Sequence, residues 1–358
     1  MKRQGFWGVV VIALMAALIP SGCKGKSVST KTFQRVGSYS GDFSGIRLSA
    51  DGQRAYVTGK NKKLVIIDVS SPATPNLLAE ENTPVPGAGG SQYGVDLLLA
   101  QSETRAIIGV SNAVQVLDIS NPSAPAVLST INDAQCPDFV TALAGVGDIS
   151  RIYYTACGRL HRVDVTVPAA PQTLSIAALP GIADANTVVT KMAVRPDEQR
   201  LFATAGNAVQ LFDLSQPSAP LALSGAAQAA ALHLDRAVDL AVAADFRTVF
   251  SIGCGLLAVQ DFTGETAPQL VGAAQFPVNT PYCFSDDNYD GIVLSSDGGT
   301  AFVASGSILR VFDMSNPAAP VSRGIGVLAG YAHDLAVSPD GAFAFVATTQ
   351  GLEILWLQ

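Results

Sequence analysis

Charge, aromatic side chains and histidine are all scarce in this chain of 358 residues. Charged residues make up 14% and aromatic residues 7% of it, and only three histidines are present. The formal net charge is −7 and no run of Lys and Arg occurs. This argues against nucleic-acid binding, which needs clustered basic side chains to contact phosphates. The C-x-x-C and G-x-S-x-G motifs are also missing, which argues against a zinc site and a serine hydrolase.

Hydrophobic residues and turn-forming residues are abundant instead. Hydrophobic residues make up 48% of the chain, which is enough for a large core, and 33 Gly and 20 Pro are present. Many turn-formers between short apolar runs are typical of an all-β protein.

One pattern recurs along the chain. An apolar strand ends in Asp, and an apolar residue, Ser or Thr, and usually two prolines follow, as in Leu64–Pro75. Six copies, 46–52 residues apart, carry the aspartates Asp68, Asp118, Asp164, Asp213, Asp261 and Asp313. A seventh copy has Trp356 at this place. We expect each Asp to accept hydrogen bonds from turn amides while proline ends the strand, which favours a structural role over a catalytic one.

Each period divides into four short β-rich runs, the organisation of one propeller blade. The seventh period stops after its third run, and Phe33–Tyr39 resembles a fourth run without the first three. The sequence therefore predicts an all-β, seven-bladed β-propeller of four-stranded antiparallel blades over residues 33–358. Its last blade would be closed by the N-terminal strand, which removes two exposed sheet edges.

The first 22 residues have the features of a signal peptide. A basic start precedes the apolar stretch Phe6–Ile19. Its 14 residues are fewer than the roughly 20 that a membrane-spanning helix needs.

Residues Ile19–Cys23 resemble the lipobox of bacterial lipoproteins, although Pro20 stands where Leu is usual. The resemblance implies acylation of Cys23, with residues 23–32 as a tether to the membrane. Lys24 after the cysteine implies, by the same resemblance, the outer membrane of a cell envelope. A plain secretory signal with an incidental cysteine is the alternative.

The run Leu64–Pro75 resembles the repeat of the LVIVD-repeat family of bacterial exported propellers, and the resemblance covers nearly all of residues 33–358. Strands such as Ala55–Thr58 are also similar to YVTN-type seven-bladed propellers, a group that includes lactonases. The paired Gly-His and Trp-Asp motifs of WD40 blades are missing. The resemblance implies a fold and an exported setting but no single activity.

Four cysteines remain besides Cys23. An even number in an exported chain indicates two disulfides, for which three connectivities exist. Proximity in the sequence favours Cys136–Cys157 and Cys254–Cys283, and four free thiols are the alternative. Both bonds would join loops on one face of the ring.

Polar residues near the start of each first strand form a predicted ring around the channel. Aligning the strands places there Ser44, Asp96, Thr141, Thr190, Asp239, Asp290 and Asp334. Four carboxylates at one channel mouth suit a cation or a polar ligand. Hydrogen bonding to the backbone of the adjacent blade is the alternative.

The segment Asp286–Gly291 contains the D-x-N-x-D-G motif with which calcium loops begin, so Asp286, Asn288 and Asp290 are candidate Ca²⁺ ligands. The helices and the final Glu of an EF-hand are missing. We expect no other cofactor.

One histidine occupies a strand position that is polar in several blades. His161 aligns with Val65, Gln115, Gln210, Arg310 and Glu353, and we expect this position to face solvent.

Two functions remain open. The first is a lipid-anchored binding or scaffolding module that presents one loop face to an unknown protein or glycan. This fits a regular repeat without a catalytic constellation. The alternative is a hydrolase or lactonase-like enzyme at the channel mouth, with candidates Asp96, Asp239, Asp290, His333 and Asp334.

Overall fold

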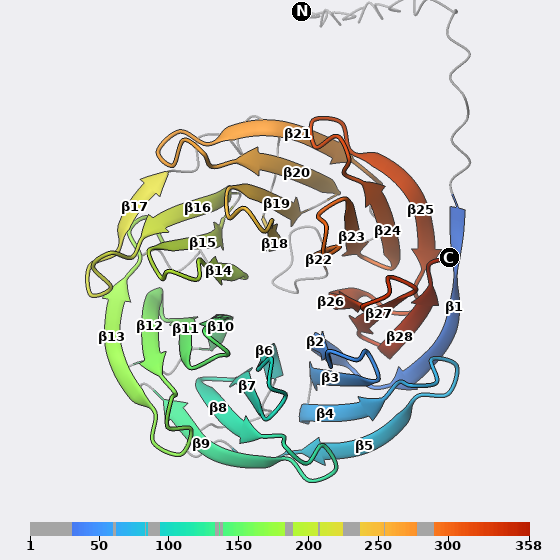
Figure 1. Ribbon diagram of the computed structural model, residues 1–358, viewed down its shortest axis with the longest axis horizontal. Helices are drawn as coiled ribbons and strands as arrows, with labels where there is room; N and C mark the ends of the chain where they lie inside the picture. The colour runs from blue at the N-terminus through green and yellow to red at the C-terminus, as the bar shows by residue number, and fades with distance from the viewer. Residues whose placement is uncertain are drawn as a thin grey trace, which may run out of the picture.

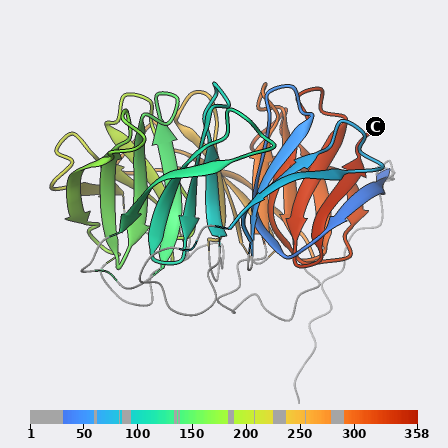
Figure 2. The same cartoon turned by 90° about the horizontal axis from the view of Figure 1, so that it is seen from below.

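The computed structural model describes residues 31–59, 62–82, 84, 94–132, 136, 139–182, 189–206, 208–224, 237–253, 255–277 and 290–358. Every regular element in these ranges is a β-strand, so none of them contains a helix that is long and apolar enough to cross a membrane. The strands stand around a common centre and run between the two faces of a ring (Figures 1 and 2). The predicted signal peptide and Cys23 lie outside the described residues.

Five antiparallel sheets have four strands each, which follow one another from the centre of the ring outward (Figure 1). Their strands are β2 (Phe43–Leu48), β3 (Arg54–Gly59), β4 (Lys62–Asp68) and β5 (Asn76–Glu81); β6 (Gly94–Leu99), β7 (Arg105–Val110), β8 (Ala113–Asp118) and β9 (Ala126–Asn132); β10 (Val140–Val146), β11 (Arg151–Ala156), β12 (Arg159–Asp164) and β13 (Gln172–Ala178); β14 (Met192–Val194), β15 (Arg200–Ala205), β16 (Ala208–Asp213) and β17 (Leu221–Ser224); and β18 (Asp239–Val242), β19 (Thr248–Gly253), β20 (Leu256–Asp261) and β21 (Gln269–Gln275). These sheets are the predicted propeller blades.

A sixth sheet has eight strands, in the order β22-β23-β24-β25-β1-β28-β27-β26. Their bounds are β22 (Asp290–Leu294), β23 (Thr300–Ser305), β24 (Ile308–Asp313), β25 (Val321–Val327), β1 (Lys31–Ser40), β28 (Gly351–Trp356), β27 (Phe343–Thr348) and β26 (Ala332–Val337). The expectation of seven separate four-stranded sheets is therefore wrong at this place.

The N-terminal strand joins two sets of strands into this larger sheet. β1 pairs antiparallel with β28, from Gln34 opposite Trp356 to Ser40 opposite Gly351. Because β28 ends at Trp356, the first three residues of β1 extend past it. They pair instead in parallel with Gly324–Gly326 of β25, whose outer edge would otherwise leave backbone groups unpaired. β1 begins at Lys31, two residues before the predicted start of the propeller.

Burial on both faces explains why the inner strands are apolar throughout. In β3, Tyr56 belongs to a cluster with Leu97 of the following blade. The next residue, Val57, belongs to a cluster with Phe345 and Ile354 of the eight-stranded sheet. Alternate residues of one strand thus form the core with two different neighbours.

Short turns join the first and second strands, as the sequence predicts. In the turn after β26, Asp340 accepts hydrogen bonds from the Ser338 hydroxyl at 2.5 Å and from the Ala342 amide at 2.9 Å. Gly341 has a φ of 69°, a left-handed conformation that costs glycine little.

Candidate functional site

Seven innermost strands, one per repeat, place a residue each at the same level of the ring centre. We define this channel position by strand pairing. It is the residue just before the one that lies opposite the fourth residue of the second strand. In β26 this residue is Asp334, because Leu335 lies opposite Val346 of β27. The residues at this channel position are Gly45, Asp96, Ala142, Lys191, Asp239, Gly291 and Asp334.

The ring predicted from the sequence is therefore wrong in four places. One residue before the channel position lie Ser44, Thr141, Thr190 and Asp290. They are equivalent to His333, at which the register of β26 shifts between Ala332 and Asp334. A shift of one residue turns a side chain to the other face of the sheet, so aligning sequences alone mixes two sets of side chains.

Three buried carboxylates at the channel position connect neighbouring blades. The Oδ2 atom of each accepts an amide from the first strand of the next blade: Asp96 from Leu143 at 3.3 Å, Asp239 from Ile292 at 2.9 Å, and Asp334 from Ile46 at 3.1 Å. The Oδ1 atom of each accepts the amide of the next residue in its own strand, at 2.7–2.8 Å. These are the contacts to the adjacent blade that the sequence left open as the alternative to a ligand site.

The blades that donate these amides carry small residues at the channel position, namely Gly45, Ala142 and Gly291. A Cβ atom on Gly291 would lie 3.0 Å from the Cα atom of Asp334, closer than ordinary contact allows. The small residues let adjacent first strands approach each other near the centre of the ring.

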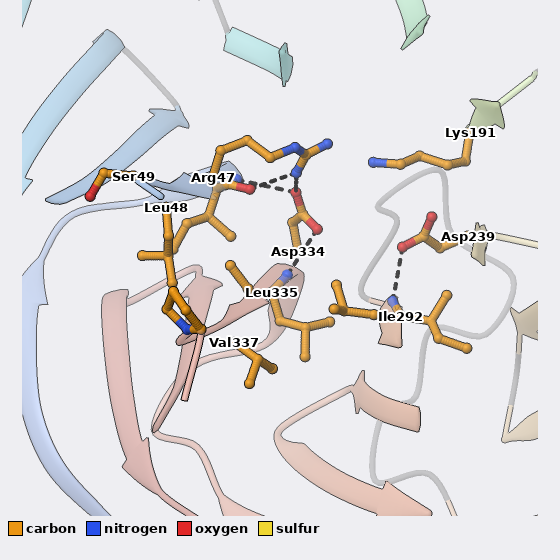
Figure 3. Close-up of a pocket in the computed structure, with 13 residues that line it drawn as sticks. Arg47, Leu48, Ser49, Lys191, Asp239, Ile292, Asp334, Leu335 and Val337 are labelled. Carbon is orange, nitrogen blue, oxygen red and sulfur yellow. Dashed lines mark hydrogen bonds and ion pairs between the residues drawn. The ribbon is translucent and has the colours of Figure 1, made fainter. Parts of the chain in front are cut away.

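Two basic side chains, which the sequence analysis missed, lie among the carboxylates (Figure 3). Arg47 Nη1 is 2.8 Å from Asp334 Oδ2, and Arg47 Nη2 is 3.5 Å from Asp96 Oδ1. Lys191 Nζ is also 3.5 Å from Asp96 Oδ1. Lys191 occupies the channel position itself, and Arg47 follows Gly45 by two residues on the same face of β2. The sequence signal that could have found them is a single basic residue in or beside a mostly apolar first strand.

Two of the protein's own cations thus pair with two of the carboxylates that the sequence suggested for a bound cation. Among the described residues, no group of three or more His, Cys, Asp or Glu side chains has a geometry that could hold a metal ion.

Burial and neighbouring charge shift the pKa values of this cluster. Burial raises the pKa of the Asp239 carboxyl to about 6, Lys191 opposes this, and the Asp334 carboxylate adds to it. Burial acts in the same direction on Asp334, but Lys191 and Arg47 outweigh it and hold its pKa below the ordinary value. Burial alone would lower the pKa of Lys191, yet Asp96, Asp334 and Asp239 raise it.

The other predicted candidates are not brought together in the same way. Asp290 and His333 are half-buried and precede the channel position. Of the predicted calcium loop, only Asp290 lies within the described residues, whereas Asp286 and Asn288 lie outside them.

The third strands contain a second set of buried polar side chains. His161 is only 1% exposed, so the expectation that it faces solvent is wrong. The equivalent residues are buried as well: Val65, Gln115, Gln210, Arg310 and Glu353. Sequence periodicity gave the wrong answer because both faces of a third strand are covered by neighbouring blades.

Two of these residues hold connections between blades. Glu353 accepts the amides of Ala329 and Gly330, at 2.9–3.0 Å, in the connection from β25 to β26. Arg310 donates to the carbonyl oxygen of Pro277, which follows β21, and its guanidinium lies 4.6 Å from the centroid of the Phe276 ring.

A disulfide bond lies on the face of the ring that carries the connections between blades. Cys136, in the connection from β9 to β10, is bonded to Cys157, in the turn between β11 and β12. The second predicted pair, Cys254 and Cys283, lies outside the described residues.

Comparison with known proteins agrees with the repeat pattern. The model of the LVIVD repeat matches residues 41–83, 102–133, 293–325 and 329–355. The chain carries LVIVD repeats. No curated protein matches its sequence.

Solved structures show the same fold as these LVIVD repeats. The C-terminal WD40 domain of Sif2 matches with a TM-score of 0.65 and 11% identity, over 92% of this chain and 99% of that one. A chain of a mitotic checkpoint complex matches with a TM-score of 0.65 and 14% identity, over 98% of this chain and 99% of that one. At these identities the similarity concerns the fold alone.

The aspartate that recurs in the sequence pattern stabilises its own turn. In six repeats its Oδ1 atom accepts the amide two residues further on, at 2.7–2.9 Å, as in Asp68 with Ser70. These bonds confirm the predicted structural role.

The first proline of the recurring pattern contacts the outer strand of the preceding blade. The carbonyl oxygen of Pro168 accepts a hydrogen bond from the Ser129 hydroxyl at 2.6 Å. Where the outer strand has glycine instead, the approach is closer: a Cβ atom on Gly272 would lie 2.2 Å from the carbonyl oxygen of Pro317. The proline turn is therefore a latch between consecutive blades.

At β25, strand β1 makes the contact that the proline turn makes at other outer strands. Phe33 of β1 packs on Gly324 of β25, where a Cβ atom would lie 2.5 Å from the Phe33 ring. The parallel pairing of β1 with β25 thus replaces the proline contact at this place, and it joins the two sets of strands into one sheet.

Proposed function

We propose that this chain is a non-enzymatic binding module, exported and anchored to the cell envelope by a lipid on Cys23. It presents to a protein or glycan partner the face of the ring that carries the connections between blades. One observation carries the proposal. The contacts within the framework repeat from blade to blade, whereas the buried side chain beneath each connection differs, as Arg310 and Glu353 do.

Rigid repeats with variable connections are the arrangement in which propellers place binding. The bond between Cys136 and Cys157 supports this assignment, because it ties a connection between blades to a turn on the same face. Arg47 and Lys191 form ion pairs with Asp334 and Asp96 inside the protein, and this supports the module over a hydrolase or lactonase.

We further count the eight-stranded sheet as two blades, which makes a seven-bladed ring closed by β1. The seven equivalent channel positions, one on each first strand, support this count.

The anchor is tested separately from the partner. Cells that express the chain are fed labelled palmitate and fractionated. We expect the label on the wild-type chain in the membrane fraction, and a Cys23→Ala chain without label in the soluble fraction. A labelled Cys23→Ala chain, or an unlabelled wild-type chain, contradicts the lipid anchor.

The partner is tested by crosslinking in intact cells, followed by purification of the chain. Phe139→Asp changes an exposed apolar side chain in the connection from β9 to β10, on the proposed face. Gln199→Ala changes an exposed turn on the opposite face and is the control. We expect Phe139→Asp to reduce the crosslinked product and the control to keep it; the reverse contradicts the proposal. Protease or periodate treatment of the cells beforehand distinguishes a protein partner from a glycan.

A further inference from the structure

A cavity of about 320 Å³ lies at the ring centre, beside the buried carboxylates (Figure 3). Pockets that bind small ligands begin at about this size. Its charged side is formed by Arg47, Lys191, Asp239 and Asp334. The rest of its wall is mostly apolar, with Leu48, Val293, Leu335, Val337 and Pro339.

The carboxylate of Asp239 takes no part in the ion pairs around the cavity. Arg47 contacts Asp334 and Asp96, and Lys191 contacts Asp96. Asp239 is 5% exposed and has no basic side chain within 4 Å among the described residues. Three carboxylates against two cations give this cluster a net charge of −1 when all are ionised.

The remaining bonding capacity of Asp239 suits an ammonium group. Each of its oxygens accepts one backbone amide, from Leu240 and from Ile292. A carboxylate has about four acceptor sites, so both oxygens keep capacity for a further donor. In Figure 3, the Lys191 side chain extends toward Arg47, and the Asp239 carboxylate is bonded to the Ile292 amide.

We infer that this cavity is a binding site for a small organic ammonium compound, whose cationic group binds Asp239 and whose apolar body packs against Leu48, Val293 and Val337. A charge-assisted hydrogen bond is stronger than a neutral one, and a buried carboxylate that forms no ion pair gains most from it. The site is separate from the loop face proposed above.

An anionic ligand fits the cavity less well, because Arg47 and Lys191 already have carboxylate partners. A bare divalent ion fits less well too. Ca²⁺ takes six to eight oxygen ligands, whereas the Asp239 oxygens are engaged with amides and Lys191 lies opposite.

The test is calorimetric titration of the purified full chain with benzylamine, benzyl alcohol and benzoate. The three share one apolar body and differ in charge. We expect benzylamine to bind about tenfold or more tightly than either of the others. Asp239→Asn should weaken benzylamine binding by a similar factor. Asp261→Asn, in the same blade but in the turn of the repeat, should leave it unchanged.

A second variant tests the cavity independently of any effect that Asp239→Asn has on folding. Val337→Phe fills the cavity without changing its charge and should abolish benzylamine binding. The inference is overturned if benzoate or benzyl alcohol binds as well as benzylamine, if benzylamine does not bind, or if binding survives Val337→Phe.

Discussion

Phe33 closes the ring, and its removal should have a large effect on stability. The side chain is 6% exposed and belongs to a cluster with Phe302, Leu309 and Leu355. Truncating a buried Phe to Ala costs about 3–5 kcal/mol. We expect Phe33→Ala to lower the free energy of unfolding of the purified chain by this amount in urea titration. The control is Val327→Ala in β25, which is 63% exposed and should change stability by about 0.5 kcal/mol or less.

A double-mutant cycle tests the packing of Phe33 on β25 directly. Gly324→Ala should cost about 1–3 kcal/mol, because its Cβ atom would lie 2.5 Å from the Phe33 ring. In the Phe33→Ala background the same substitution should cost less. The relief is partial, because the Lys31 carbonyl oxygen would still be 2.7 Å away. The assignment of β1 as the substitute latch is refuted if the two substitutions are additive, or if Phe33→Ala costs no more than Val327→Ala.

Three further predictions concern the latch, the disulfide and the channel. Gly272→Ala should destabilise the chain by about 1–3 kcal/mol in urea titration, because its Cβ atom would meet the Pro317 carbonyl oxygen; Gly264→Ala, whose nearest contact is 3.4 Å, should be nearly neutral. Cys157→Ser should lower stability by about 3 kcal/mol, since the bond closes a loop of 21 residues, and a reductant should abolish the difference between the wild-type chain and the variant. Asp239 has a folded-state pKa of about 6, above its ordinary value of 3.8, so the folded state binds more protons between these two values. Stability should therefore fall as pH rises from about 4 to 6, by about 2–3 kcal/mol from this group, and Asp239→Asn should remove that part of the slope.

The sequence predicted features that recur between repeats, together with one disulfide bond between cysteines that are close in the sequence. The four-stranded blades, the turn-capping role of Asp68 and its equivalents, and the bond between Cys136 and Cys157 all follow from periodicity or proximity. A repeated motif can be aligned with itself, so each copy supports the interpretation of the others.

Features that differ between repeats were beyond the same reasoning. His333 and Asp334 are adjacent, and only the register shift in β26 shows which one lies at the channel position. Lys191 and Arg47 occur once each, so no repeat marked them. Burial of Glu353 and His161 depends on covering blades and connections that are distant along the chain.

The contact between the two ends of the ring has a consequence for the order of assembly. β1 is synthesised before β28, and their contacting residues Arg35 and Glu353 are 318 positions apart. At roughly 5–20 residues per second, synthesis leaves β1 without its partner for tens of seconds. During this time the newborn chain contains a lone strand at one end and an open edge at the other. The ring can close only after β28 has been translated, so a chain that is cut before β28 should leave β1 without its antiparallel partner.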